Sequence, residues 1–165
     1  MGTSKYKLNR RALMTVLFDG AAGAAVVGGA IGGIWLIAEP VPTRGNVTLY
    51  TNPQCGCCEG YADYLRQHGF EVTPKPTNDL AEISRKAGIP ADLQGCHTAF
   101  IGNYVVEGHV PVEAIEKLLA ERPSIKGVTL PGMPTGSPGM SGEKIGPLTI
   151  YVIGQDGKPS VFMTL

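Results

Sequence analysis

Apolar residues follow two periodic patterns along residues 47–123, and these patterns predict a series of short strands and helices. Runs of β-branched and aromatic residues are typical of strands, whereas apolar residues that recur every three or four positions are typical of helices. In chain order, the predicted elements are a strand at 47–50, a helix carrying Tyr61, Tyr64, Leu65 and His68, a strand at 70–73, a helix carrying Leu80, Ile83 and Ala87, strands at 99–101 and 104–106, and a helix with Ile115, Leu118 and Leu119 facing inward.

Residues that end helices or form tight turns separate these elements. Gly69 ends the first helix, and Gly88 with Pro90 ends the second. Gly102-Asn103 lies between the two later strands and predicts a tight hairpin. The resulting order, β-α-β-α-β-β-α, predicts an α/β fold with a thioredoxin-like core.

The region after the last core helix has a different composition. Residues 127–146 are rich in Gly, Pro and Ser and are predicted to form an ordered but irregular loop. Two apolar runs at 148–152 and 160–163 flank Asp156-Gly157, a pattern that indicates a second hairpin. We expect this extra C-terminal β-hairpin to lie outside the minimal core.

The N-terminal segment is predicted to be a transmembrane or signal helix. Gly20–Ala38 contains nineteen residues and no charged side chain. At about 1.5 Å per residue it approaches the roughly 30 Å of a hydrocarbon core. Basic residues precede the run, so the positive-inside rule places the rest of the chain across the membrane. We therefore expect a membrane anchor or export signal at 1–38, a linker at 39–46 and a thioredoxin-like metal-binding domain at 47–165.

A cleaved export signal competes with a retained anchor. The stretch Asn9-Arg10-Arg11-Ala12-Leu13-Met14 loosely resembles a twin-arginine signal. However, no small-x-small cleavage site lies near Ala38, because Leu36 occupies the upstream position, and this favours the anchor. Both interpretations put the predicted domain on the periplasmic side of the cytoplasmic membrane, either anchored or released.

The charge distribution argues against nucleic-acid binding. The whole chain has a formal net charge of zero, but four basic residues precede the first acidic one. From residue 39 onward ten Lys and Arg face thirteen Asp and Glu, a net charge of −3. No basic surface of the size that nucleic acid requires is expected, so nucleic acid is excluded as a partner.

The cysteines are the candidate functional residues. The chain has four: three lie in Cys55-Gly56-Cys57-Cys58 and the fourth is Cys96, followed by His97. Thiolate and imidazole are ligands for soft metals such as Cu(I) and Zn(II). Cys55 and Cys58 also have the C-x-x-C spacing of redox-active dithiols. A metal site, a disulfide exchanger and a plain structural disulfide are therefore the alternatives.

Two observations favour the metal site. Thioredoxins and glutaredoxins usually carry a proline before the third strand, facing the dithiol, whereas this chain has Gly95-Cys96-His97-Thr98 there. Disulfide exchange needs one attacking and one resolving thiol, and the third thiol of Cys57 would favour scrambling. A metal centre gains a ligand from the same residue.

The predicted hairpin adds a further candidate ligand. With Gly102-Asn103 at the turn, residues whose numbers sum to about 205 lie opposite one another, which pairs Cys96 with His109. Four thiolates with one or two imidazoles suit Cu(I) or Zn(II), and bridging sulfurs allow more than one ion. Met133 and Met140 lie in the Gly/Pro-rich region, but no spacing argument places them near the thiols.

Several motifs together resemble the CopG-like family, periplasmic proteins of copper-resistance systems that were long described as a domain of unknown function. The resemblance spans about residues 47–161 and rests on four stretches: Tyr50-Thr51-Asn52-Pro53-Gln54-Cys55-Gly56-Cys57-Cys58, Gly95-Cys96-His97-Thr98-Ala99, Val106-Glu107-Gly108-His109-Val110-Pro111 and Pro131-Gly132-Met133-Pro134-Thr135-Gly136-Ser137-Pro138-Gly139-Met140. It implies a thioredoxin-like fold, a place outside the cytoplasmic membrane and copper bound at Cys55, Cys57, Cys58, Cys96 and His97.

The leading hypothesis is an exported copper-binding protein that sequesters copper or cycles it between Cu(I) and Cu(II), and so contributes to copper resistance. Its metal ligands are Cys55, Cys57, Cys58, Cys96 and His97, with His109 as a ligand or orienting group; copper, as Cu(I) in one or several ions, is favoured over zinc. A redox role would make it a copper oxidoreductase. The alternatives are a periplasmic thiol–disulfide oxidoreductase that uses Cys55 and Cys58, and a copper chaperone that delivers ions to an efflux or periplasmic partner.

Overall fold

The computed structural model describes residues 43–154 and 158–165. The predicted N-terminal helix, the first part of the linker and the Asp156-Gly157 turn lie outside these residues. Within the described ranges, no helix has both the length and the apolar character that a membrane crossing requires. All described residues belong to one of the two units into which the chain divides, Glu39–Leu165.

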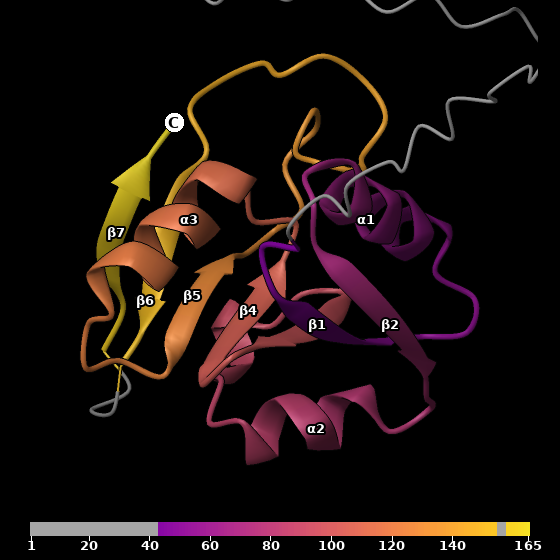
Figure 1. The fold of residues 1–165 in the computed structure, drawn as a ribbon, viewed down its shortest axis with the longest axis horizontal. Coiled ribbons are helices and arrows are strands. Elements are labelled where there is room, and N and C mark those ends of the chain that lie inside the picture. The colour runs from indigo at the N-terminus through magenta and orange to yellow at the C-terminus, as the bar shows by residue number, and fades with distance from the viewer. Residues whose placement is uncertain (1–42, 155–157) are drawn as a thin grey trace, which may run out of the picture. The chain divides into compact units, whose positions relative to one another are not determined.

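The described residues form a mixed α/β structure with one sheet and three α-helices (Figure 1). From the first strand to the third helix, the elements follow the predicted order β-α-β-α-β-β-α. The elements are β1 (Asn46–Thr51), α1 (Gly56–Gln67), β2 (Glu71–Pro76), α2 (Leu80–Lys86), a short 3-10 helix (Ala91–Leu93), β3 (His97–Ile101), β4 (Tyr104–Gly108), α3 (Val112–Glu121), β5 (Gly127–Leu130), β6 (Thr149–Ile153) and β7 (Ser160–Thr164).

The seven strands make one continuous sheet in the order β2-β1-β3-β4-β5-β6-β7. β1 runs parallel to β2 and antiparallel to β3, and β3 pairs antiparallel with β4. The β3–β4 register joins Ala99 to Val106 and Ile101 to Tyr104, so the residue numbers of each pair sum to the predicted 205. The hairpin turn was therefore predicted correctly.

The prediction of an irregular loop from residue 127 was wrong for its first four residues. Gly127–Leu130 forms β5, which runs parallel to β4 and antiparallel to β6. Gly127 looked like the start of a loop, but a Cβ atom there would overlap the backbone of Val105, so the close strand pairing needs a glycine. The C-terminal hairpin of β6 and β7 is an addition to the predicted core, as expected, and β5 joins it to β4 in one continuous sheet.

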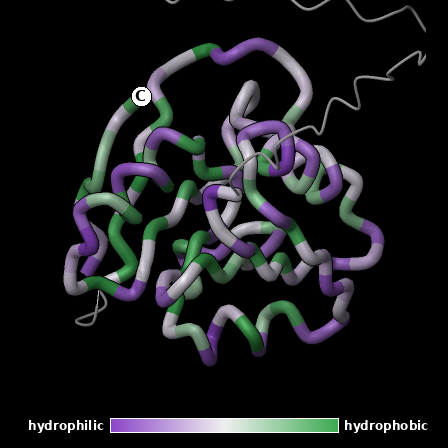
Figure 2. Tube along the Cα trace, viewed as in Figure 1, coloured by the Kyte–Doolittle hydropathy of each residue, from purple (hydrophilic) through white to green (hydrophobic). Residues whose placement is uncertain are grey.

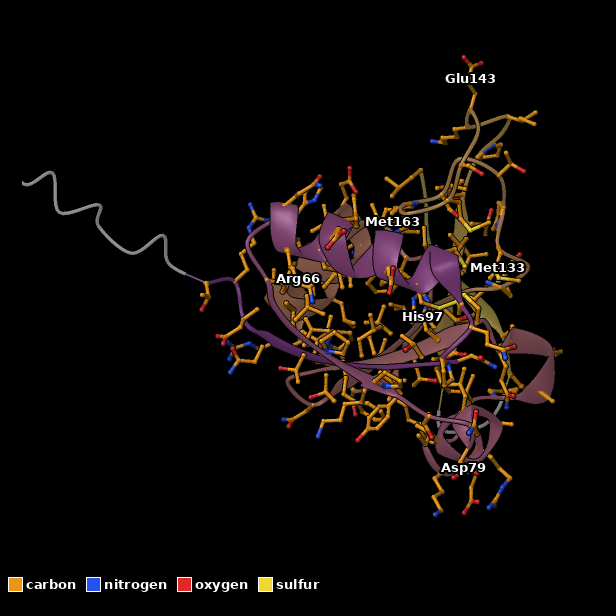
Figure 3. All side chains as sticks on the ribbon, turned by 90° about the vertical axis from the view of Figure 1, so that its right-hand side faces the viewer. Arg66, Asp79, His97, Met133, Glu143 and Met163 are labelled. Atoms are coloured by element: carbon orange, nitrogen blue, oxygen red, sulfur yellow. A yellow bond between two sulfur atoms is a disulfide. The ribbon has the colours of Figure 1, made fainter. Side chains whose placement is uncertain are left out.

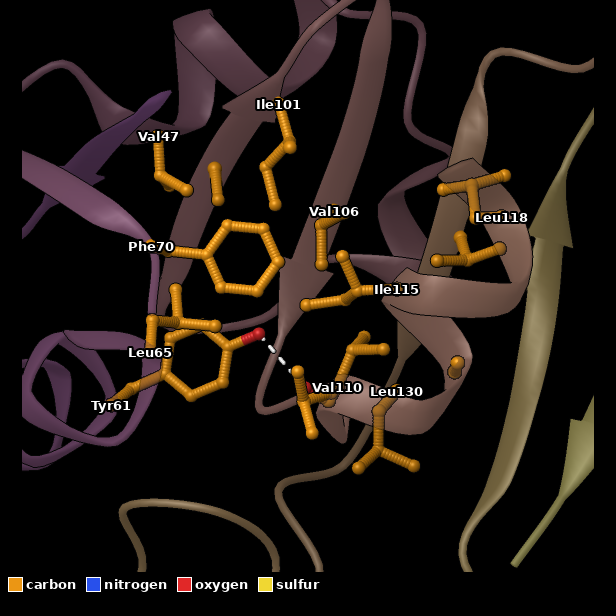
Figure 4. Packing of buried hydrophobic residues seen from close by; sticks show 14 of the residues in the cluster. Val47, Tyr61, Leu65, Phe70, Ile101, Val106, Val110, Ile115, Leu118 and Leu130 are labelled. Atoms are coloured by element: carbon orange, nitrogen blue, oxygen red, sulfur yellow. Dashed lines mark hydrogen bonds between the residues drawn. The ribbon is translucent and has the colours of Figure 1, made fainter. Parts of the chain in front are cut away.

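Alternate residues of the central strands point to opposite faces of the sheet, and each face has its own apolar cluster. On one face Ala99 and Val106 pack with α1 and α3, in the cluster that includes Tyr61, Leu65, Ile115 and Leu118 (Figure 4). On the other face Val105 packs with Ile89 and Leu93, which follow α2. Figures 1 and 3 accordingly show α1 and α2 on opposite sides of the sheet.

The hydropathy of the chain follows this layering. Figure 2 shows hydrophilic and hydrophobic residues alternating along α2 and α3, as expected for helices with one buried face. The buried face of α3 carries Val112, Ala114, Ile115 and Leu118. The core thus holds α1 and α3 against the sheet, and the first turn of α1 lies at the carboxyl end of β1, where the cysteines are.

Candidate metal site

The three clustered cysteines occupy the turn between β1 and α1. Cys55 is the residue that precedes α1, and Cys57 and Cys58 lie in the first turn of the helix. Cys58 faces the interior and is 1% exposed, whereas Cys55 and Cys57 are half-buried. These sulfurs thus lie at the N-terminus of α1, where no side chain caps the free N–H groups of the helix.

The fourth cysteine reaches the same place from β3. Thr51 at the end of β1 pairs with His97 at the start of β3, so the residues before β3 lie beside the β1–α1 turn. The Sγ atom of Cys96 lies 3.8 Å from the Sγ atoms of both Cys57 and Cys58. The four sulfur atoms lie within 4.8 Å of one another. Sequence-distant thiols therefore converge in one pocket, as predicted.

Two of the four thiols are joined in this structure. Cys55 and Cys58 form a disulfide, while Cys57 and Cys96 are free cysteines. The Sγ atom of Cys57 lies 3.3 Å from that of Cys55. Since a metal binds thiolate rather than disulfide sulfur, Cys55 and Cys58 become ligands only after reduction.

Both candidate histidines direct a ring nitrogen at Cys96. The Nδ1 atom of His97 lies 3.4 Å from the Cys96 sulfur, and the Nε2 atom of His109 lies 3.2 Å from it. These three residues form a second group of donors within 4.8 Å of one another. Cys96 therefore belongs both to the group of four cysteines, the thiol group, and to the group of Cys96, His97 and His109, the thiol–imidazole group. Figure 3 shows His97 between α1 and the sheet.

Backbone carbonyls fix the tautomer of each imidazole. The Nε2–H group of His97 donates to the Gly108 carbonyl oxygen at 3.0 Å, and the Nδ1–H group of His109 donates to the Pro138 carbonyl oxygen at 2.6 Å. A carbonyl oxygen only accepts, so the remaining nitrogen of each ring carries a lone pair toward Cys96. This arrangement, in which the second N–H is held by the backbone, is the one that metal-binding histidines adopt.

Burial sets the protonation of these groups. Removal from water lowers the pKa of His97 to about 3, with a further reduction from nearby His109, and burial also lowers the pKa of His109. Both rings are therefore neutral near pH 7, the form that binds metals. Burial raises the pKa of the Cys96 thiol to about 12, and Cys57 adds to the increase. A metal ion at this thiol must displace its proton.

The spacing of the donors fits tetrahedral coordination. Two thiolates bound to one ion at about 2.3 Å lie about 3.8 Å apart, and a thiolate and an imidazole nitrogen on one ion lie about 3.5 Å apart. The distances from the Cys96 sulfur are 3.8 Å to the Cys57 and Cys58 sulfurs and 3.4 and 3.2 Å to the two imidazole nitrogens. Cys96 is thus spaced from the free thiol of Cys57 and from each imidazole nitrogen as two ligands of one soft ion are.

Tyr61, to which the sequence analysis assigned no functional role, packs against both imidazoles. Its ring is fully buried and stacks on His97 with the centroids 4.5 Å apart, and it meets His109 edge-on at 5.3 Å. Its hydroxyl donates to the Val110 carbonyl oxygen at 2.9 Å (Figure 4). Helical periodicity marked Tyr61 as a core residue, but only the packing shows that it confines the two rings.

Glu107 was also missed, although it precedes His109 by two residues. Its side chain is fully buried, and its Oε1 atom accepts from the Gly95 N–H at 2.7 Å, which holds the turn next to Cys96. Its Oε2 atom has no hydrogen-bond partner among the described residues. An acidic residue in an apolar strand was the one signal for it, because such residues are rarely fully buried unless they are paired.

The Gly/Pro-rich loop closes over the site from a third direction. Besides Pro138, which binds His109, Gly139 lies directly against α1: a Cβ atom at Gly60 would be 2.8 Å from the Gly139 carbonyl oxygen. The same loop carries Met133, whose side chain is 40% exposed, and Met140.

The burial of Glu107 predicts a pH-dependent stability. Burial raises its pKa from 4.5 to about 7, so the folded state prefers the protonated form and loses this stability as the pH rises through 7. We compare the unfolding free energy of wild type with that of the Glu107→Gln variant. Relative to the variant, wild type should be about 3 kcal/mol less stable at pH 8 than at pH 4. Urea unfolding of the metal-free, disulfide-containing protein measures it.

Taking the difference between the two proteins removes the contributions of the histidines, which have the opposite sign. Their lowered pKa values stabilise the folded state above pH 6.5 and destabilise it as the pH falls. A difference that stays constant from pH 4 to pH 8 would show that Glu107 does not change its proton affinity on folding.

Comparisons with known proteins find relatives of the region that holds this site. Residues 93–140 match the model of a family described as a protein of unknown function, DUF411. This range includes Cys96, His97 and His109. No curated protein gives a significant match. Two solved structures, forms 1 and 2 of "Copper resistance protein CopG", are 34% identical to the chain with a TM-score of 0.68. Both alignments cover 73% of this chain, and they cover 97% of the form 1 chain and 98% of the form 2 chain.

Proposed function

Because this chain belongs to the family of the copper resistance protein CopG, we propose that it binds copper as cargo at its four thiols and two imidazoles, and that it contributes to copper resistance. The observation that carries the proposal is the position of Cys96. Its sulfur lies 3.8 Å from two other cysteine sulfurs and within 3.4 Å of one nitrogen of each imidazole. Such a set of soft donors is suited to Cu(I).

In the proposed site each residue has a distinct part. Cys57 supplies a thiolate, and Cys55 and Cys58 do so once their disulfide is reduced. Cys96 bridges the thiol group and the imidazole group, so the site accommodates more than one ion. His97 and His109 supply nitrogen donors whose lone pairs are already directed by the Gly108 and Pro138 carbonyls.

Copper is favoured over zinc on the chemistry of the donors and on the family. The donor spacing alone suits either metal, because both bind thiolate and imidazole. The related structures are of a copper resistance protein. We therefore propose that Cu(I) is the principal cargo. The protein either stores this copper or transfers it to a copper efflux protein or another periplasmic copper-handling protein.

We further propose that the core is thioredoxin-like and that it works on the periplasmic side of the cytoplasmic membrane. The strand order β2-β1-β3-β4, with β3 antiparallel to its neighbours and helices on both faces, supports the first point. The uncharged run Gly20–Ala38 after basic residues supports the second, as an anchor or as an export signal.

The Cys55–Cys58 disulfide supports a second candidate function, that of a thiol–disulfide oxidoreductase. Cys55 and Cys58 are the C-x-x-C pair, they are joined in this structure and they precede or begin a helix, as in redox-active dithiols. Reduction of insulin-type disulfides that depends on these two cysteines alone would favour this function over copper binding.

Anaerobic titration with Cu(I) tests the copper proposal. The protein is reduced with a dithiol, freed of the reductant and titrated in competition with a chromogenic Cu(I) chelator. We expect tight binding of at least one Cu(I) per chain and a near-ultraviolet band from thiolate–copper charge transfer. Far weaker affinity for Zn(II) is expected in the same assay.

Protein whose thiols are alkylated after reduction serves as the control and should compete poorly for Cu(I). If the reduced protein competes no better than the alkylated one, the copper proposal is wrong.

A further inference from the structure

The two edges of the seven-stranded sheet are protected to different degrees against pairing with further strands. β2 forms one edge and β7 forms the other, at opposite ends of the sheet in Figure 1. Edge strands present unpaired N–H and C=O groups, and proteins commonly blunt them with proline and with charged side chains. β2 has both, in Pro74, Lys75 and Pro76. The segment from Ser160 to Leu165, which contains β7, has neither.

The prolines of β2 lie at positions whose backbone faces away from the sheet. The N–H groups of Glu71 and Thr77 donate to carbonyl oxygens on the β1 side. In a parallel pair, every second residue of a strand bonds to the neighbouring strand. Val72, Pro74 and Pro76 are therefore the residues that face outward, and the two prolines have no N–H group to offer. The β2 edge is thus poorly suited to accept another strand.

The backbone of β7, by contrast, directs free hydrogen-bonding groups outward. Leu165 donates to the Leu148 carbonyl oxygen at 3.0 Å and accepts from the Leu148 N–H at 2.8 Å. Residue pairs of antiparallel strands alternate between bonded and non-bonded positions. The next pair, Thr164 with Thr149, is therefore non-bonded, and Thr164 directs its N–H and C=O away from β6. Within the described residues, no strand lies beyond β7 to receive these groups.

A β-bulge gives β7 one packed face and one open face. The register with β6 shifts so that Phe162 is an extra residue between Val161 and Met163. Phe162 and Met163 both pack against the core cluster on the α3 side of the sheet. Val161 lies on the opposite face, next to Tyr151, and is 59% exposed. The outer edge of β7 and the Val161 side chain therefore remain available for contact.

We propose that β7 pairs antiparallel with β7 of a second copy of this chain, so that two sheets join edge to edge about a two-fold axis. A strand edge is complementary to itself in this arrangement, because the outward N–H of each copy meets an outward C=O of the other. Both copies of Val161 then lie on the same face of the joined sheet and shield each other from water. This inference concerns an interface and is independent of the proposed copper binding.

The difference between the two edges selects a second β7 as the partner strand. Pairing of β7 with β2 of the next copy would build an open filament, but Pro74 and Pro76 remove the donors which that pairing needs. Pairing of two β2 strands would also bring positive Lys75 side chains together. β7 carries no charge, so two β7 strands meet without repulsion. The assembly therefore closes as a dimer.

The proposed interface lies away from the candidate metal site. The strands β4, β5 and β6 separate β7 from β3, and the cysteines lie before β3 and in the β1–α1 turn. Pairing at β7 therefore leaves the thiols uncovered. Because each strand contributes only five residues, the buried area is small and the dimer should form in a concentration-dependent manner. A covalent trap is accordingly the appropriate measurement.

Photo-cross-linking of the full chain in excess detergent tests the proposal. The probe p-benzoylphenylalanine replaces Val161, and a mixture of isotopically light and heavy chains identifies cross-links between copies. We expect a cross-linked dimer in which mass spectrometry joins residue 161 to residues 160–165 of the second copy. The same probe in place of Lys75, on the β2 edge, is the matched control and should yield less than about a tenth as much dimer.

The Thr164→Pro variant removes an outward N–H without removing a hydrogen bond to β6. With the probe at position 161, we expect the dimer yield to fall at least about tenfold, because the two-fold axis doubles each lost bond. Thr164→Val keeps the N–H and should leave the yield unchanged. If circular dichroism shows that Thr164→Pro does not fold, Thr164→Lys decides with the same measurement, because it places like charges at the paired edges and should lower the yield severalfold.

Three results would overturn the proposal. They are cross-links from residue 161 that stay within one chain or reach residues 1–42, equal dimer yields from the two edges, and an undiminished yield in the folded position-164 variant that decides the test. Cu(I) titration of Thr164→Pro separates this outcome from the copper proposal. Its Cu(I) affinity should equal that of wild type, so that failure of the dimer leaves copper binding standing, and the reverse.

Discussion

Replacement of Cys96 by serine is expected to lower the affinity for Cu(I) by at least about 100-fold, because this residue belongs to both donor groups. Loss of a partner that merely orients a ligand costs about 10- to 100-fold in metal affinity. Loss of the bridging sulfur removes a ligand itself and also separates the imidazoles from the thiols. Competition with a chromogenic Cu(I) chelator under nitrogen measures the change.

The Cys57→Ser variant is the matched control. Cys57 belongs to the thiol group alone, so its loss leaves Cys96, His97 and His109 in place. We expect a clearly smaller loss of affinity than for Cys96→Ser, with the band from thiolate–copper charge transfer weakened but present. Equal losses in the two variants would show that Cys96 has no bridging role, and unchanged binding in Cys57→Ser would remove Cys57 from the site.

Gly139→Ala is expected to destabilise the protein by about 3 kcal/mol, the combined cost of an unfavourable backbone angle and of overpacking. Gly139 has φ +76°, and a Cβ atom there would overlap the backbone of Gly60 and Tyr61 in α1. The loop must move away from the helix. Urea unfolding of the metal-free protein measures the loss.

The same substitution should also weaken copper binding. Movement of the loop withdraws the Pro138 carbonyl oxygen, which accepts from the Nδ1–H of His109 at 2.6 Å. The ring then no longer has a fixed tautomer, and we expect about a tenfold loss in Cu(I) affinity.

Gly132→Ala separates the two causes of instability. Gly132 lies in the same loop with φ +77°, but no atom lies within 4 Å of the Cβ that alanine would add. The backbone cost alone is about 1 kcal/mol, and copper affinity should not change. If Gly132→Ala and Gly139→Ala lose the same stability and the same affinity, the contact between the loop and α1 has no part in building the site.

Most of the core could be predicted from the sequence because its signals are local. Helical spacing of Tyr61, Tyr64 and Leu65 and the Gly102-Asn103 turn depend on neighbouring residues only, and the structure has α1 and the β3–β4 hairpin at these places. The strand β5 could not be predicted in this way. Its glycine is a loop signal locally, and only the close approach of β4 makes it a strand residue.

The candidate donors could also be named from the sequence, since thiols and imidazoles are chemically distinctive and the hairpin register predicted that His109 lies opposite Cys96. The groups that support the donors could not. Tyr61 is an ordinary core residue by its periodicity, and the buried Glu107 acts through the Gly95 N–H. Their importance depends on contacts between segments far apart in the chain.

By itself, then, the sequence determined which residues can bind a soft metal and where most helices and strands lie, because these depend on side-chain chemistry and short-range periodicity. The tertiary structure decided that Cys96 meets both Cys57 and Cys58, that Cys55 and Cys58 are joined, and which nitrogen of each imidazole is free. The contacts of Cys96 depend on the pairing of β1 with β3, which sets the residues before β3 beside the β1–α1 turn. The free nitrogens depend on the carbonyls of Gly108 and Pro138, which only the folded sheet and its loop bring to the two rings.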